Sequence, residues 1–203
     1  MTDLLFYGHP DSGHACKVAL ALAGLPHRTV RIDMWAPRDT RPADFLAASP
    51  FGEVPALVID GEPYTQSGAI LLELATRFGV LGGESHAGLK RARELLMWEA
   101  NRIGMCLPQL KEAQRVKGEG FTPGAIDWLM GRYETDALRF GVLLGDAPFF
   151  HGDAPGIGDC AIWGYVQWLP EAGVEPTSAM AGWIARMRAL PAMRAPQDFF
   201  PPA

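Results

Sequence analysis

The stretch FGEVPALVIDG, residues 51–61, constrains the fold more than any other part of the chain. It sets a proline at the start of an apolar run that ends in an Asp-Gly turn. Because proline has no N–H to donate to a neighbouring strand, a sheet accepts it only at an edge, a bulge or a strand start. We therefore expect the backbone around Val54 and Pro55 to lie beside something other than an ordinary strand. A proline that simply begins an edge strand is the alternative interpretation.

The first 79 residues predict a small mixed sheet covered by helices. Stretches typical of strands lie at 4–7, 27–33, 51–59 and 62–65. Helix-forming stretches lie at 14–23, 42–48 and 67–79. The order is β-α-β-α-β-β-α, in which a crossover helix makes the first two strands parallel and the final hairpin is antiparallel.

The character of the sequence changes after this region. Residues 79–88 contain four glycines and no periodicity, so we take 80–88 as a linker between a first domain at 1–79 and a second at 89–203. Long helical stretches follow at about 88–116, 124–144, 156–170 and 178–190, and no alternating strand pattern survives. The second domain is expected to be all-helical.

Composition narrows the class of protein. The net charge of −5 divides almost evenly between the two parts, so neither carries the basic face that nucleic acids select. With no charged-then-apolar leader and no long apolar run, we expect a cytoplasmic protein that does not enter a membrane. The three cysteines, Cys16, Cys106 and Cys160, form no CxxC pair, and the histidines show no ligand spacing, so no metal is expected.

Four motifs in order carry a resemblance to a known family: YGHPDSGHACKV after the first strand, SPFGEVPALV at 49–58, YTQSGAILLELA at 64–75 and GDAPGIGDCAIWGYVQW at 152–168. Together they resemble the cytosolic glutathione transferases, and most closely the bacterial members with a serine after the first strand. The resemblance implies a thioredoxin-like α/β domain followed by an all-α domain. It also implies a detoxifying homodimer that conjugates glutathione, its co-substrate, to a small apolar electrophile.

The resemblance also implies a glutathione site. The Val54-Pro55 bond would be cis, and the main chain of Val54 would pair with the tripeptide as an added strand does. Gln66 and Ser67 would hold the γ-glutamyl carboxylate at the start of the third helix, where Ser67 is also the natural N-cap.

The glycine carboxylate of the tripeptide needs a cation. Family members often carry Lys or Gln where this chain has Glu53, which cannot pair with a second carboxylate. Arg38 and Arg41 are the candidates to replace that partner. Each could equally be a solvated arginine in a loop.

Ser12 is the first candidate for activating the thiol. It stands between the first strand and the first helix, where N–H groups are unpaired and a thiolate is favoured. A serine there is also an ordinary N-cap. Tyr7 is the rival, because other classes of the family use a tyrosine at the end of the first strand. A tyrosine on an apolar strand is otherwise a core residue.

Three further predictions concern the rest of the chain. We expect Trp98, Asn101, Met105 and the DFFPPA tail to line the electrophile pocket, although a Trp/Met stripe at helical spacing is also typical of a core. Phe51 is a candidate anchor for the dimer. Asp159 is expected to cap a helix that begins after Gly156, a folding feature rather than a catalytic one.

Two alternative functions stay open. One is a binding or interaction protein that keeps the fold and the glutathione site without useful turnover. The other is a glutathione-dependent thiol reductase or peroxidase that uses Cys16, which lies one helical turn after Ser12.

Overall fold

The computed structural model describes residues 2–202 and contains one mixed sheet. The strands are β1 (Leu4–Gly8), β2 (Arg28–Arg31), β3 (Ala56–Ile59) and β4 (Glu62–Thr65). Their order in the sheet is β2-β1-β3-β4; β2 is parallel to β1, whereas β3 is antiparallel to both β1 and β4. Asp60 and Gly61, with φ of 50° and 87°, make the tight hairpin turn between β3 and β4. The expected mixed sheet is confirmed.

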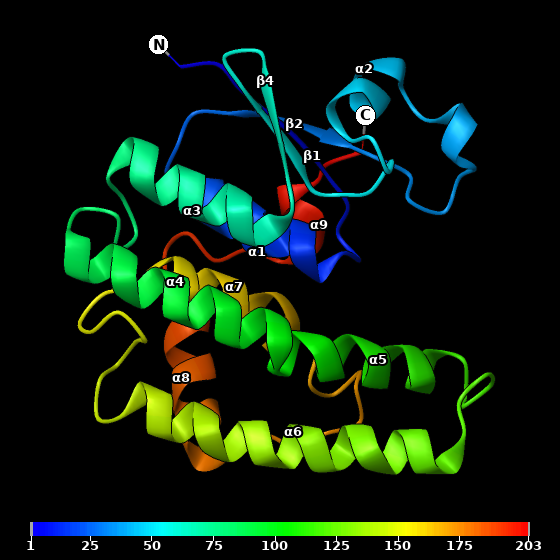
Figure 1. Cartoon of the computed structure of the whole chain (residues 1–203), viewed down its shortest axis with the longest axis vertical. Coiled ribbons are helices and arrows are strands. Elements are labelled where there is room, and N and C mark those ends of the chain that lie inside the picture. Colours follow the sequence, from blue (N-terminus) through cyan, green and yellow to red (C-terminus); the bar gives the residue numbers. More distant parts are fainter. Residues whose placement is uncertain (1, 203) are drawn as a thin grey trace.

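Helices cover both faces of this sheet (Figure 1). The helices are α1 (Gly13–Leu22), the short 3-10 turn η1 (Arg38–Thr40), α2 (Ala43–Ala48) and α3 (Ser67–Phe78). Because side chains alternate along a strand, Phe6 faces the large core with α1 and α3, whereas Tyr7 faces a small core with Phe45 of α2. Helices α1 and α3 thus lie between the sheet and the second, helical part of the chain.

The elements of the second part of the chain, within residues 86–202, are all helices, as expected, joined by loops and one isolated bridge between Phe149 and Gly152. Its helices are α4 (His86–Asn101), α5 (Ile103–Arg115), α6 (Pro123–Leu144), α7 (Ile157–Val166), α8 (Ser178–Arg188) and α9 (Pro196–Phe199). The stretch at 88–116, expected to be one helix, is two, because the backbone leaves helical geometry at Arg102 (φ −125°, ψ −101°). Pro108, which has no N–H to give to the carbonyl of residue 104, follows the break within α5.

Helix α7 is the centre of the helical part, and every one of its residues is buried. Its start is fixed by Asp159, which accepts hydrogen bonds from the main-chain N–H of Gly156 at 2.9 Å and of Phe150 at 3.0 Å. The same carboxylate accepts from the indole N–H of Trp183 at 2.8 Å. Asp159 therefore caps the start of α7, which is the folding role that was expected. Helix α7 packs against α1.

A buried ion pair connects the two parts of the chain. Lys17 of α1 places its Nζ 2.8 Å from the Oε1 of Glu99 of α4, and both side chains are almost fully buried. Burial lowers the pKa of Lys17 and raises that of Glu99, since each charge has lost its water. The pair couples the first helix of the sheet domain to the helical bundle.

Candidate functional site

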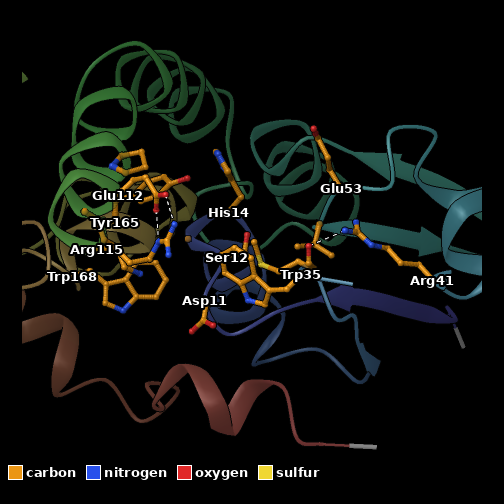
Figure 2. Close-up of a pocket in the computed structure, with 15 residues that line it drawn as sticks. Asp11, Ser12, His14, Trp35, Arg41, Glu53, Glu112, Arg115, Tyr165 and Trp168 are labelled. Atoms are coloured by element: carbon orange, nitrogen blue, oxygen red, sulfur yellow. Dashed lines mark hydrogen bonds and ion pairs between the residues drawn. The ribbon is translucent and has the colours of Figure 1, made fainter. Parts of the chain in front are cut away.

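A cavity of about 790 Å³ opens between the sheet and the helical part. Its sheet-side wall consists of Asp11, Ser12, Gly13, His14, Met34, Trp35, Arg41, Glu53 and Val54. Its helix-side wall consists of Pro108, Lys111, Glu112, Arg115, Tyr165 and Trp168. Figure 2 shows Ser12 and His14 between the two groups, with Glu112, Arg115, Tyr165 and Trp168 on one side and Glu53 and Arg41 on the other.

Ser12 lies at the start of α1 and lines the cavity. Its Oγ accepts a hydrogen bond from the main-chain N–H of Ala15 at 3.2 Å, so it is the N-cap of the helix. That bond uses a lone pair of the hydroxyl and leaves its proton free to be donated. The N-cap and the thiol-activating interpretations of Ser12 are therefore compatible, since one needs an acceptor and the other a donor.

Tyr7, the rival for that role, lies away from the cavity. Its ring is buried against Phe45 in the small core, and its hydroxyl donates to Asp44 Oδ2 at 3.0 Å. Burial and the Asp44 carboxylate raise the pKa of Tyr7 to about 12. Of the two hydroxyls that the sequence nominated, only that of Ser12 lines the cavity.

Cys16 is also turned away from the cavity. Its Sγ is buried and donates to the carbonyl of Pro10 at 3.3 Å. Burial raises the pKa of this thiol to about 12, so it is protonated at neutral pH. The geometry is that of a small core residue rather than a nucleophile.

A smaller cavity of about 90 Å³ continues from the larger one, and the two share His14, Glu53 and Val54. The Val54-Pro55 bond is cis. The main chain of Glu53 is paired with Ser49 Oγ, which donates to its carbonyl and accepts from its N–H. No partner within residues 2–202 is found for the N–H and C=O of Val54. A free donor and acceptor on one residue are what an extended peptide needs in order to pair.

The start of α3 forms the floor of the smaller cavity and differs from expectation. The N-cap is Gln66, with φ of 67° and ψ of 112°, and Ser67 is the first helical residue. The hydroxyl of Ser67 is therefore not the cap; its Oγ lies 2.9 Å from Nδ1 of His14. A non-glycine residue at such a φ is strained. The unpaired N–H groups of the first turn of α3 follow Gln66 and Ser67, which both line the smaller cavity.

His14 is a residue of the site that sequence reasoning missed. Its Nδ1 faces both Ser67 Oγ and, at 3.4 Å, Nζ of Lys17. Because an ammonium can only donate, Nδ1 is assigned as the acceptor and the proton of the neutral ring is on Nε2. The His14 side chain is exposed at the cavity, yet partial loss of water there and the nearby Lys17 charge lower its pKa to about 4. The neutral ring thus connects the smaller cavity to the Lys17–Glu99 pair.

Both arginines proposed for the glycine carboxylate already donate to main-chain carbonyls. Arg41 uses all three guanidinium nitrogens on main-chain carbonyls, including those of Met34 at 2.8 Å and Gly52. Arg38 donates to the carbonyl of Pro50 at 2.8 Å. Both arginines brace the loop around Glu53, and only Arg41 also lines the larger cavity.

Comparison with known proteins decides the family. Residues 13–77 match the family model described as Glutathione S-transferase, N-terminal domain. The chain is 31% identical over 207 residues to the Disulfide-bond oxidoreductase YfcG of Escherichia coli (strain K12), an alignment covering 95% of this chain and 92% of that protein.

The chain belongs to the glutathione transferase family. It is also 32% identical over 167 residues to a Maleylacetoacetate isomerase of Rhizobium meliloti (strain 1021), covering 79% of this chain and 78% of the relative. The crystal structure of a glutathione S-transferase from Xanthobacter autotrophicus Py2 superposes with a TM-score of 0.80 at 25% identity, covering 96% of this chain and 98% of that one.

In this member of the family the residues expected to line the electrophile pocket lie elsewhere. Trp98 and Met105 pack against the large core, and the exposed Asn101 donates to the carbonyl of Met97. In the tail, Phe200 is buried against Phe6 behind β1. The helix-side wall comes instead from α5, which follows the break at Arg102, and from the end of α7 and the turn after it.

Within residues 2–202 no three His, Cys, Asp or Glu side chains gather as a metal would require. No helix there is long and apolar enough to cross a bilayer.

Proposed function

We propose that this protein is a glutathione transferase in which Ser12 activates the thiol of glutathione for attack on a small electrophile. The observation that supports this proposal is the position of the Ser12 hydroxyl. Its oxygen accepts from the N–H of Ala15, and its proton is left to be donated in the larger cavity, two residues before His14, which lines both cavities. The start of α1 adds a positive electrostatic potential that favours a thiolate.

The two cavities suggest how the tripeptide binds. The γ-glutamyl carboxylate would enter the smaller cavity and meet the first N–H groups of α3 with Gln66 and Ser67. The cysteinyl backbone would pair with the free N–H and C=O of Val54. The sulfur would then face Ser12, and the rest of the larger cavity would hold the electrophile.

The energy of one hydrogen bond is enough for activation. A bond to a charged group contributes roughly 1.5–3 kcal/mol, which corresponds to a fall of about one to two units in the pKa of the thiol. A thiol that starts near about 8.5 would then be largely ionised at neutral pH. The thiolate, not the thiol, attacks the electrophile.

Turnover tests this proposal. Conjugation of glutathione to chlorodinitrobenzene should be measured for the wild type and for Ser12→Gly, since glycine costs an N-cap only a few tenths of a kcal/mol. We expect kcat/KM to fall by about ten- to a hundredfold in Ser12→Gly. Glutathione binding without any turnover in the wild type would contradict the proposal and would favour the non-catalytic binding protein.

Reduction of disulfides is a second candidate function, favoured by the identity to the relative named Disulfide-bond oxidoreductase. The buried Cys16 thiol does not support a mechanism through that residue. In the form proposed here, the glutathione thiolate attacks a disulfide, one new S–S bond forms, and the displaced sulfur leaves as a thiolate. Reduction of a small disulfide by glutathione should then survive Cys16→Ala and fall in Ser12→Gly.

A homodimer is part of the proposed function. Phe51, whose side chain is 76% exposed, projects from the loop before Val54 at the rim of the smaller cavity. Burial of such an aromatic side chain in a second copy of the chain would remove it from water. Sedimentation should give a dimer for the wild type and a larger monomer fraction for Phe51→Ser; a wild-type monomer would contradict this assembly.

A further inference from the structure

The helix-side wall carries charge, whereas the sequence predicted a pocket for an apolar electrophile. Pro108, Lys111, Glu112 and Arg115 lie three and four residues apart on α5, so they share the face that meets the cavity. Tyr165 and Trp168 add aromatic surface from the end of α7 and the turn after it. The wall therefore combines flat apolar surface with ionised groups.

The two cations of this wall differ in their partners. Arg115 is committed to Glu112, since its Nε lies 2.7 Å from one carboxylate oxygen and its Nη2 contacts the other (Figure 2). Lys111 makes no ion pair or hydrogen bond with any of residues 2–202; its Nζ lies 3.5 Å from the ring centre of Trp168. Lys111 is half-buried and lines the cavity.

The surroundings of Lys111 leave its charge under-compensated. Asp11, Glu171 and Glu112 favour the ammonium from a distance, but loss of water outweighs them and lowers the pKa of Lys111. A partly desolvated cation gains more from a bound anion than a fully solvated one does. Contact with the Trp168 face leaves N–H groups of the ammonium able to donate to such an anion.

Charges on the opposite wall restrict where an anion can lie. Asp11 and Glu53 are the carboxylates of the sheet-side wall, and Arg41 on that wall is occupied by main-chain carbonyls. An anionic group on the second substrate is therefore repelled by these two carboxylates and attracted to Lys111 on α5. A bound substrate would be oriented by this difference, with its uncharged end toward Ser12.

We propose that the electrophile of this enzyme carries an anionic group, such as a carboxylate, on a flat unsaturated or aromatic body, and that Lys111 binds that group. This inference rests on the proposed transferase function. The flat body lies along the aromatic side chains of Trp35, Tyr165 and Trp168 that line the cavity. Its reactive carbon then faces the sulfur held at Ser12.

Two matched substrates test the charge alone: a chlorodinitrobenzoate and the corresponding chlorodinitrobenzamide. In both, the glutathione sulfur forms a C–S bond to the ring, the C–Cl bond breaks, and chloride leaves with the bonding electron pair. The thiol proton goes to solvent. The readout is the ratio of kcat/KM for the carboxylate to kcat/KM for the carboxamide.

We expect this ratio to fall about tenfold in Lys111→Met, as for loss of one charge-assisted hydrogen bond, and to be largely kept in Lys111→Arg. Lys90→Met, on the exposed surface of α4, is the control and should not move it. An unchanged ratio in Lys111→Met overturns the inference. If the KM for glutathione rises instead with both substrates, Lys111 holds the glycine carboxylate and the inference is wrong.

A binding measurement separates failure of this inference from failure of the proposed function. The S-aryl glutathione conjugates of the two rings can be titrated calorimetrically into each variant, which requires no turnover. A wild-type preference for the carboxylate conjugate that is lost in Lys111→Met supports the site even if catalysis is absent. Equal dissociation constants for the two conjugates in the wild type contradict it even if chlorodinitrobenzene is conjugated.

Discussion

The sheet side of the two cavities presents helix starts and the main chain of Val54 together with side chains such as Trp35, whereas the helix-side wall presents side chains of α5, of α7 and of the turn after α7. On the sheet side, the cavities are lined by Val54, whose N–H and C=O have no partner within residues 2–202, and by the first turns of α1 and α3. On the helix side, Lys111, Tyr165 and Trp168 supply the surface. Main-chain groups do not change with substitution, so the first wall suits a fixed co-substrate and the second a variable one.

The largest expected effect is a loss of stability on breaking the Lys17–Glu99 ion pair, which connects α1 to α4. Lys17→Met leaves the Glu99 carboxylate buried without a partner and should lower the free energy of unfolding by about 3–5 kcal/mol. The double variant Lys17→Met, Glu99→Leu removes both charges and should recover most of that loss. Chemical denaturation measures both variants.

The exposed pair Lys90–Glu94 on α4 is the matched control for that cycle. Lys90→Met should change the free energy of unfolding by less than about 0.5 kcal/mol, because exposed i,i+4 pairs contribute little. If the double variant is as unstable as Lys17→Met, the loss comes from packing rather than from an orphaned charge.

A smaller effect is expected from Ser67→Ala, and it tests whether the two walls bind different substrates. Ser67→Ala should weaken glutathione binding by about ten- to a hundredfold, since a hydroxyl bond to a carboxylate would be lost. The KM for the electrophile should shift much less. Ser178, likewise the first residue of its helix but on α8 and outside both cavities, gives the control Ser178→Ala. If Ser67→Ala weakened the binding of glutathione and of the electrophile equally, the two walls would not bind different substrates.

The lowered pKa of His14, on the sheet side, predicts that the free energy of unfolding depends on pH. Its pKa in the folded protein is lowered to about 4 from the ordinary 6.5, so between these values the unfolded chain binds a proton that the folded protein does not. The free energy of unfolding should therefore fall as the pH drops through this window. His14→Gln should flatten the slope, which urea unfolding at several pH values would measure; identical slopes would contradict the neutral His14.

The sequence could predict the sheet side because its signals are local. The proline after Val54, the serine at the start of α1 and the Gln66-Ser67 pair each mark a backbone feature by residue type and position. His14 could have been found in the same way, since it lies in the first helical turn after Ser12. The contact between His14 and Ser67 could not be predicted, because 53 positions separate the two residues.

The helix side could not be predicted because helical spacing does not say which face meets the cavity. Trp98, Asn101 and Met105 share a periodic stripe, yet the helix is broken at Arg102, and it is Lys111 of α5 that lines the cavity. Arg41 shows the same limit. Its charge suggested a carboxylate partner, but the fold uses its guanidinium on main-chain carbonyls.

The smallest expected effect is that of Tyr7→Phe. The hydroxyl donates to Asp44 in the small core, so its loss should cost roughly 1 kcal/mol of stability or less. The pKa of bound glutathione should not change. A raised thiol pKa in this variant would make Tyr7 part of the site despite its distance from the cavity.

The most direct test of the account is the ultraviolet absorbance of the glutathione thiolate, titrated in complex with the wild type, Ser12→Gly and Tyr7→Phe. If Ser12 donates to the sulfur, the bound thiol of the wild type and of Tyr7→Phe titrates about one to two units below free glutathione, and Ser12→Gly alone abolishes the shift. If bound glutathione keeps its free pKa in all three proteins, Ser12 does not activate the thiol and the proposed mechanism is wrong.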